Sequence, residues 1–466
     1  MPVDSIHPLY AGHEKKAQRV RDAVSGSDAI KDRTETYLPC PTGPLYLLEG
    51  DELKEATARY ETYIQRAVWL GVTKRTHDGM IGAVFRKEPQ VELESPIEYM
   101  NEDCDGSGMS LTQFAKLATS ALVTNGRHGI LVDYPEAEDG LTREQTSGLR
   151  ATFRTYQSPS IINWRREGEL LKLVVLHEWY EDGEDEFEKD FKEQYRVLSL
   201  ENGAYVQRVF RDGIEASRSE PRDSNGARWT AIPFQFIGTV NNDENPDAPL
   251  LLDLADVNIA HYRNSADLEE SSFITGQPMF HVDIGETTDK EWKELNPNGI
   301  TVGSRRGVQT KGGSMSLVQA EPNNLPNELM IRKEAQMLAI GARLIEQRGG
   351  NETAESVRAR SGAENANLSS VATNVSDAIE NCLEWALSFM ANQSSSGIIF
   401  KLNQQFYSED ADPQMIAAMI TGLDRGVWAK ADFRDWARQR DLIAPERTDE
   451  DIDAEVEAGG TNIGAL

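Results

Sequence analysis

Three long helical patterns lie between residues 251 and 391, and they limit the folds open to this chain. The first covers 251–272, contains no proline and carries one broken apolar stripe. The second covers 325–347, and the third begins near 353 or 361 and runs to 391. A helix of about 30 residues is roughly 45 Å long. The third pattern therefore predicts a helix as long as a small domain is wide.

The helix predicted over 325–347 carries apolar residues on two faces. A helix that is apolar on two faces needs a neighbour on each of them. One face consists of Ile331, Ala335, Leu338, Ala342 and Ile345, and the other of Met330, Met337, Gly341 and Leu344.

The remaining patterns predict an α+β fold. Helices are expected near 19–31, 52–70, 76–85 and from Ser110, where Gln113 completes a capping box. Residues 129–240 read as a mostly antiparallel sheet with a hairpin turn at Asn202-Gly203. Residues 273–318 are strand-like, with a short helix at 289–295. A strand at 398–406, two short helices at 413–423 and 430–440, and a mobile acidic tail complete the chain.

Charge and composition exclude several classes of protein. The 466 residues include 48 basic and 77 acidic side chains, which gives a net charge of −29. A simple nucleic-acid binder or a polybasic membrane-surface protein needs the opposite sign. No run approaches the ~18 apolar residues of a membrane span, and the N-terminus lacks an apolar signal core. We therefore expect a soluble protein made in the cytoplasm, without a disulfide framework from its three cysteines.

The motifs of catalysis are absent or incomplete. No Gly-Lys pair exists, which excludes a phosphate-binding P-loop. His177-Glu178 lacks the second histidine of a zinc-protease helix. Residues 101–108 imitate half of a calcium loop, but Thr112 stands where the bidentate glutamate is required. We expect no enzymatic activity, no metal and no cofactor.

A polar segment joins the second and third long helices. Gly349-Gly350 permits backbone angles that other residues resist, and Arg348, Asn351, Arg358 and Arg360 surround it. Such a segment cannot form core, so it faces solvent or lines a cavity. For its arginines, taken singly, a solvated face or a local ion pair is the ordinary interpretation.

Several short stretches, taken in order, resemble the portal proteins of tailed bacteriophages, in a branch catalogued as a phage domain of unknown function. The resemblance runs from about residue 6 to 440. It is carried most strongly by residues 249–267, which read PLLLDLADVNIAHYRNSAD. Further support comes from Arg21-Asp22, Ile30-Lys31, YLP at 37–39, GAVF at 82–85, GRHGILVDYP at 126–135, IINWR at 161–165, MLAIGARL at 337–344 and LSSV at 368–371.

The resemblance implies a portal-like α+β fold with a helical and β-rich wing, a two-helix stem, a β-rich clip, a long wing helix and a small helical crown. The corresponding ranges are 1–50 for an N-terminal arm, 51–248 for the wing, 249–272 and 323–347 for the stem helices, 273–322 for the clip, 348–361 for a tunnel loop, 362–408 for the long wing helix and a strand, 409–445 for the crown and 446–466 for the mobile acidic tail.

The same resemblance assigns roles to residues. The DNA-channel loop contains Arg348, Gly349, Gly350, Asn351, Arg358 and Arg360. Two interpretations stay open for its arginines: transient contact with DNA phosphates, or ion pairs with acids of the adjacent subunit. The stem interface between subunits contains Ile331, Ala335, Leu338, Ala342, Ile345 and Tyr262, and the clip carries the basic pair Arg305 and Arg306.

The function implied is a ring of twelve subunits at one capsid vertex, through which double-stranded DNA is packaged and ejected. DNA contact would be weak and non-specific, because an acidic channel wall repels DNA and lets it slide. Terminase, a head–tail adaptor and the major capsid protein would be partners, and the mature location would be the virion. Two alternatives stay open: an acidic intracellular hydrolase, and a virion or adaptor protein without a channel.

Overall fold

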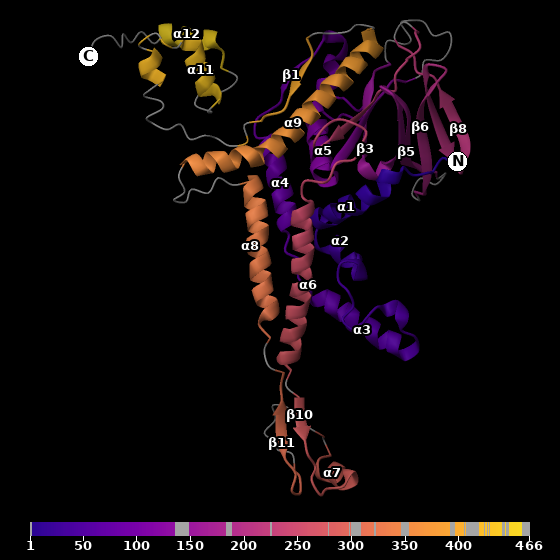
Figure 1. Cartoon of the computed structure of the whole chain (residues 1–466), viewed down its shortest axis with the longest axis vertical. Coiled ribbons are helices and arrows are strands. Elements are labelled where there is room, and N and C mark those ends of the chain that lie inside the picture. Colours follow the sequence, from indigo (N-terminus) through magenta and orange to yellow (C-terminus); the bar gives the residue numbers. More distant parts are fainter. Residues whose placement is uncertain are drawn as a thin grey trace. The chain divides into compact units, whose positions relative to one another are not determined.

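The computed structural model describes residues 2–135, 149–182, 189–223, 226–277, 279–297, 299, 309–320, 323–345, 354–391, 397–404, 406, 419–423, 425, 427, 429–439, 443 and 447–458. The chain divides into two compact units, Met1–Leu402 and Asn403–Leu466. Helices and strands are mixed in the larger unit, as the α+β expectation requires (Figure 1).

The larger unit begins with helices. They are α1 (Pro8–Ser25), α2 (Ser27–Asp32), α3 (Gly50–Arg66), α4 (Val72–Val84) and α5 (Leu111–Asn125), with single 3-10 turns η1 (Thr34–Thr36) and η2 (Leu45–Leu47) and a longer one, η3 (Ser95–Asn101). The expected helix near 19–31 therefore starts eleven residues too late and runs over a break at Gly26. Pro8 fixes the first helical residue of α1, and His7 Nδ1 accepts a hydrogen bond from the Leu9 N–H at 3.2 Å.

Two antiparallel sheets follow, which confirms the β-rich region. The three-stranded sheet has the order β3-β2-β9, with β2 (Arg127–Asp133), β3 (Thr152–Gln157) and β9 (Phe234–Gly238). The five-stranded sheet is a meander of β4 (Ile161–Glu167), β5 (Leu170–Glu181), β6 (Phe191–Glu201), β7 (Ala204–Arg211) and β8 (Ile214–Ser219). Asn202 and Gly203 both have positive φ, +50° and +79°, as a two-residue hairpin requires.

The main core lies between the two sheets. Leu131 and Phe234 of the small sheet pack in one buried cluster with Trp164, Val174 and Tyr205 of the large one. On the opposite face of the large sheet, Val3 and Tyr10 from the N-terminal segment cover a second apolar cluster. The His7 N–H donates to the Ile162 carbonyl at 2.9 Å, so the chain start is fixed against the sheet.

The third long helix, α9 (Ala354–Ala391), runs beside β9, β12 and α5. Its predicted seam is buried, which confirms it: Leu368, Ala372, Val375, Ile379, Cys382, Ala386 and Phe389. The short strand β12 (Ile399–Lys401) pairs antiparallel with β1 (Gln90–Glu92). Because β12 follows α9 and β1 follows α4, this pairing ties the end of the larger unit to its first third.

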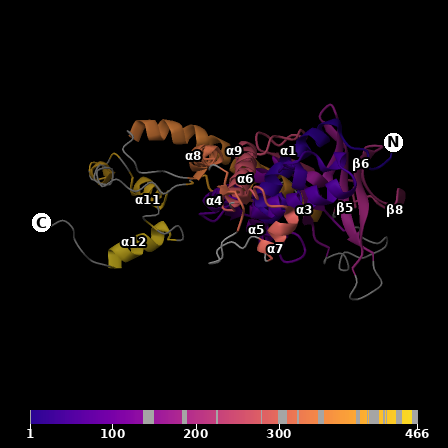
Figure 2. The same ribbon diagram turned by 90° about the horizontal axis from the view of Figure 1, so that it is seen from below.

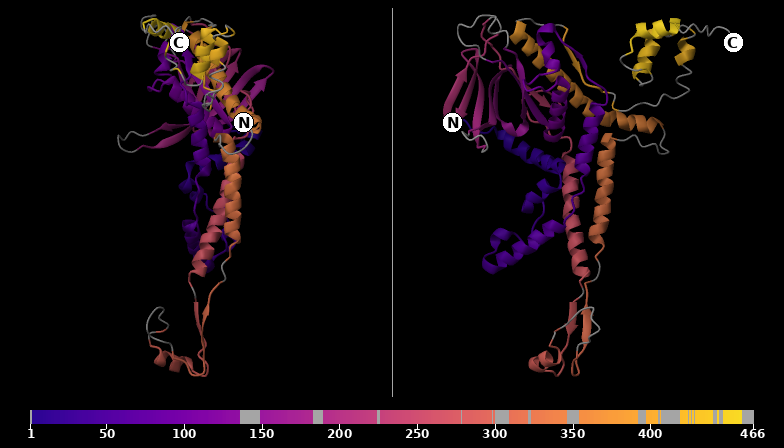
Figure 3. Two further views of the ribbon diagram at one scale, coloured as in Figure 1. Left: turned by 90° about the vertical axis from the view of Figure 1, so that its left-hand side faces the viewer. Right: turned by 180° about the vertical axis from the view of Figure 1, so that it is seen from behind.

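The other two long helices form a pair. They are α6 (Leu252–Thr275) and α8 (Leu325–Ile345), and they lie side by side in Figures 1 and 3. Between them the chain forms β10 (Met279–Val282), α7 (Asp289–Leu295) and β11 (Met315–Val318), with β10 and β11 antiparallel. The predicted helix at 289–295 is confirmed, and a capping box between Thr288 and Glu291 opens it.

The smaller unit contradicts one expectation. It contains α11 (Lys430–Gln439) and α12 (Asp449–Ala458), and residues 419–423 are helical as well. Residues 449–458 are therefore helical where a mobile tail was expected. Three acidic residues in the first turn of α12 stabilise the helix, because they lie at the positive end of its dipole. Arg434 donates to Asp453 Oδ2 at 3.2 Å, which joins α11 to α12.

Candidate functional site

The α6–α8 pair is the candidate site, and polar contacts fix its register. Lys333 Nζ of α8 donates to the Ala260 carbonyl of α6 at 2.9 Å and also contacts Asn264. His261 Nε2 lies 3.2 Å from Glu334 Oε1. Met337, one turn further along α8, is fully buried. One face of α8 therefore makes contacts within the chain, and Figure 2 shows the helix beside α6 and α4.

Helix α6 is held on its other sides as well. Tyr63 Oη of α3 donates to Asp267 Oδ1 at 2.6 Å, and Arg66 Nη1 donates to Glu270 Oε2 at 2.7 Å. The Asn258 side chain donates to the Leu70 carbonyl at 2.9 Å. Because neighbours surround α6, it forms a fixed base against which α8 is placed.

Tyr262 is a correction to the predicted subunit interface. Its side chain is fully buried in the same chain, in a cluster with Tyr60, Tyr63 and Ile259. Its ring meets Trp69 edge-on at a centroid distance of 6.1 Å. A residue with no exposed surface cannot contact a second copy, so Tyr262 belongs to the core that supports α6.

The opposite face of α8 is exposed and apolar. Ile331 is 58% exposed and Leu338 is 56% exposed, and Ala335 between them is exposed too. These three residues lie on one stripe because they are four and three residues apart. Ala342 and Ile345 continue the stripe along the α8 backbone, and their side chains lie outside the described residues.

Gly341 marks the buried face where α8 meets α4. A Cβ atom at this position would lie 3.0 Å from Thr76 Oγ1, which is closer than ordinary contact. The two faces predicted from the sequence are therefore both present, but they differ. The Met337–Gly341 face is covered within the chain, and the Ile331–Leu338 face is not.

The predicted DNA-channel loop is shorter than expected. Helix α9 begins at Ala354, so Arg358 and Arg360 lie on helical backbone and not in a loop that reaches 361. Arg348, Gly349, Gly350 and Asn351 lie outside the described residues, and so do Arg305 and Arg306.

The acidic groups of the β region have structural partners. Burial alone would raise the pKa of Glu178, but Arg196, Tyr156 and Gln194 donate hydrogen bonds to its carboxylate and lower the pKa. Such a carboxylate is held ionised and is a poor proton donor at neutral pH. Within the described ranges, no group of three or more His, Cys, Asp or Glu side chains is arranged to hold a metal ion.

The segment that imitates a calcium loop is a capped turn. Asp105 Oδ1 accepts from the backbone N–H of Ser107 and Met109, and Asp103 Oδ1 accepts from Gly108. The Ser110–Gln113 capping box that follows is confirmed. These carboxylates are therefore used to shape the turn that starts α5.

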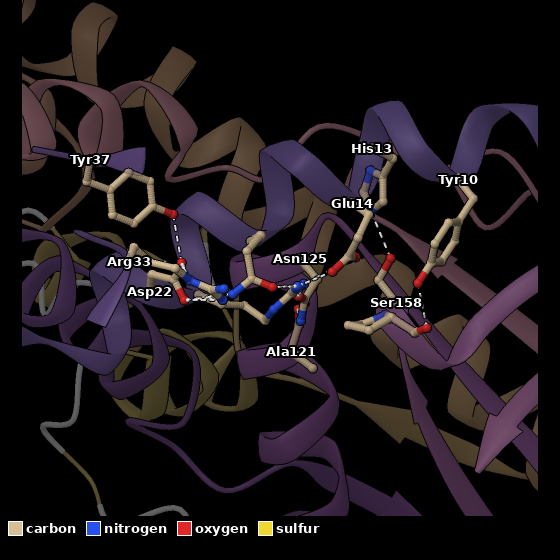
Figure 4. A network of polar contacts seen from close by, with 12 residues as sticks. Tyr10, His13, Glu14, Asp22, Arg33, Tyr37, Ala121, Asn125 and Ser158 are labelled. Carbon is tan, nitrogen blue, oxygen red and sulfur yellow. Dashed lines mark hydrogen bonds and ion pairs between the residues drawn. The ribbon is translucent and has the colours of Figure 1, made fainter. Parts of the chain in front are cut away.

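A polar network at α1 explains one of the stretches that carry the family resemblance (Figure 4). Arg21 donates to Asn125 Oδ1 of α5 at 2.8 Å. Asp22 Oδ2 accepts from Arg33 at 2.8 Å and from Tyr37 Oη at 2.7 Å. The Arg21-Asp22 pair therefore fixes α1 against α5 and against the turn after α2. Sequence patterns alone gave no sign of these partners, which are 11 to 104 residues away.

Part of the chain matches a known sequence family. Residues 249–390 match the model of a family described as "Domain of unknown function (DUF4055)", a range that covers α6, α8 and almost all of α9 but less than half of the chain. No curated protein matches the chain significantly. Over the residues described, no helix is long and apolar enough to cross a membrane.

Three solved structures contain chains that are similar at low identity. The virion of a native gene transfer agent particle has a chain with 13% identity and a TM-score of 0.39, covering 83% of this chain and 89% of that one. The neck of the empty particle has a chain with 12% identity and a TM-score of 0.41, and the match covers 84% of this chain and 90% of that one. The neck of the native particle, computed with C12 symmetry, has a chain with 13% identity and a TM-score of 0.40, and the match covers 81% of this chain and 90% of that one. With TM-scores below 0.5, these likenesses establish neither a shared fold nor a shared function.

Proposed function

We propose that this chain is a portal-type subunit of a phage-like particle, and that copies of it form a ring around a channel for double-stranded DNA. The observation that carries the proposal is the exposed stripe of Ile331, Ala335 and Leu338 beside the covered face of α8. Exposed apolar stripes on helices that are otherwise well packed mark sites of association. A neighbouring copy that packs on α8 would cover this stripe, and repetition of the contact would close a ring.

The segment between the two helices supports the same reading. The β10–β11 ribbon has two strands, and Met315, Leu317 and Val318 of β11 are each about half exposed. An isolated two-stranded ribbon is marginal in water unless its apolar surface is covered. Neighbouring copies in a ring would supply that cover.

The order of the elements also supports the proposal. Two paired helices with a β-rich insertion at one end, followed by a long buried helix, match the expectation drawn from the portal-like sequence stretches. In this reading α6 and α8 are the stem, residues 273–322 are the clip and α9 is the wing helix. The ring would occupy one vertex of the capsid, where terminase, the head–tail adaptor and the capsid protein bind.

The size and shape of the purified protein test the ring. Twelve chains of 51.9 kDa have a mass of 622.8 kDa. Light scattering and negative-stain images should give that mass and a ring with a central hole. A compact monomer at all concentrations would contradict the proposal.

Substitutions on α8 test the interface. Ala335→Glu or Ala342→Glu should block ring assembly, because an unpaired charge in a desolvated contact costs several kcal/mol and the ring repeats it at every interface. Gln336→Glu is the matched control, since Gln336 is exposed on the same helix but lies off the stripe. Normal rings from the Ala335→Glu variant would mean that this face is not buried.

The channel role is tested at the arginines. Replacing Arg348, Arg358 and Arg360 by Ala in assembled procapsids should change the length or the retention of packaged DNA if they contact phosphates. Unchanged packaging in rings of normal shape would leave the ion-pair reading in place. A control with the same change of charge replaces three exposed arginines of the first 222 residues, Arg75, Arg165 and Arg222.

A further inference from the structure

A groove of about 860 Å³ lies between α1, the turn at η1 and α6, and none of its lining residues belongs to α8. Its lining is partly apolar. Tyr10 of α1 and Ile259 of α6 contribute to it, and Ile6 at its edge is 54% exposed. The polar contacts of Figure 4 hold α1 in place beside this groove, so its shape is fixed by the fold.

The charge of the groove opposes that of the chain. Its lining contains four cationic residues and two acidic ones, a net charge of +2 in a chain whose net charge is −29. The cationic residues are Lys15, Arg19, Arg33 and Arg263, and the acidic ones are Glu14 and Asp256. Arg19 is already paired with Asp256 at 2.7 Å and Arg33 with Asp22 at 2.8 Å, so Lys15 and Arg263 are the lining cations that an acidic ligand would meet. The groove therefore suits a segment that combines apolar and acidic side chains.

The segment from η2 into α3 has that combination. Tyr46 is 81% exposed and Leu47 is 67% exposed, which places two adjacent large apolar side chains in solvent. Residues 48–55 contain four acidic side chains and one lysine, a net charge of −3. A tyrosine beside an aliphatic residue is a common anchor of protein interfaces.

The segment does not occupy the groove of its own chain, since Tyr46 and Leu47 are exposed and neither lines the groove. Helix α3 has 17 residues and is about 25 Å long, and its last turn contacts α6 through Tyr63 and Arg66. Its first turn, which follows η2, therefore lies at the far end (Figures 1 and 3). The Leu45 N–H donates to Glu35 Oε1 of η1 at 3.1 Å, which fixes the start of the segment, while Tyr46 and Leu47 after it stay exposed in the single chain.

We propose that the η2 segment of one copy binds in the α1–η1–α6 groove of the next copy. Tyr46 and Leu47 then pack on Tyr10 and Ile6, and the acidic residues after them face Lys15. Because the groove and the segment are different surfaces, the contact is head-to-tail, and its repetition closes a ring when the rotation allows. This inference rests on the proposed ring and adds a second contact to it.

Charge reversal and its rescue test the electrostatic part. Lys15→Glu should weaken association at least fivefold, as measured by sedimentation velocity at low salt. Lys16→Glu, on the same helix but outside the groove lining, should leave association unchanged. Adding Glu49→Lys to Lys15→Glu should restore at least half of the lost affinity. Equal effects of Lys15→Glu and Lys16→Glu would overturn the assignment of the groove.

Cross-linking tests the location directly. A photoreactive phenylalanine analogue at position 46 is placed in isotopically labelled chains, which are mixed with unlabelled ones. Mass spectrometry should find cross-links from position 46 to residues 6–19 or 256–263 of the other isotope. Rings of normal size whose cross-links fall elsewhere would overturn this inference and leave the ring intact. A wild-type chain that never associates would instead contradict the proposed function and this contact with it.

Discussion

Adjacent residues on α8 should respond to the same substitution in opposite ways, because they lie on different faces. Met337 is fully buried against the rest of the chain, whereas Leu338 is 56% exposed. Met337→Ala removes a buried side chain and leaves a cavity, which costs about 2–4 kcal/mol. Leu338→Ala should cost the single chain less than about 1 kcal/mol.

In ring assembly, by contrast, Leu338→Ala should weaken the contact between copies. Burying a leucine side chain completely is worth about 1.5–3 kcal/mol, so covering the exposed 56% of Leu338 would contribute about 0.8–1.7 kcal/mol to each interface. Association of Leu338→Ala should therefore be roughly 4- to 20-fold weaker per interface.

Hydrogen–deuterium exchange of the α8 amides in the single chain measures the first effect. A cost of 2–4 kcal/mol corresponds to exchange about 30- to 700-fold faster in Met337→Ala. Sedimentation velocity measures the second effect in Leu338→Ala. The reasoning is refuted if Leu338→Ala accelerates exchange as much as Met337→Ala, or if its association equals that of the wild type.

Three further predictions concern the rest of the chain. Burial, together with Arg127 and other nearby cations, lowers the pKa of His13 to about 4, so its contribution to the stability of the larger unit should be lost between pH 6.5 and 4, as the unfolded chain gains the proton first. His13→Gln should therefore reduce the fall of the melting temperature over that range, while buried His128, whose pKa is lowered to about 3, should maintain part of it. The pKa of Glu178 is lowered in the folded chain, so its ionised carboxylate stabilises the fold at pH values above 4.5, the value for the unfolded chain, and this contribution is lost as the pH falls further. Glu178→Gln should remove this part of the pH dependence of the melting temperature. Thr448 Oγ1 accepts from the Asp451 N–H at 3.1 Å at the start of α12, so Thr448→Ala should cost about 1 kcal/mol and speed amide exchange over 449–458, with no change in α11 if the cap acts locally.

Periodicity in the sequence determined the long helices and the antiparallel sheet. Apolar residues three and four apart placed the seam of α9 from Leu368 to Phe389, and that seam is buried. Turn residues such as Asn202-Gly203 placed a hairpin, since few other pairs tolerate positive φ at both positions. These features are local, so the sequence carries them without knowledge of the partners.

Which neighbour covers each apolar face was decided only by the tertiary structure. The sequence pattern of α8 predicts two apolar faces and does not distinguish them. Contacts with α4 and α6 bury Met337 on one face and leave Leu338 exposed on the other. Tyr262 fitted the stripe of α6 equally well, yet α3 and the segment before it enclose it within the chain. The acidic residues of 449–458 suggested a mobile tail, but Arg434 on another helix pairs with Asp453. In each case the deciding contact joins residues distant in the sequence, and periodicity along one segment carries no information about a partner on another.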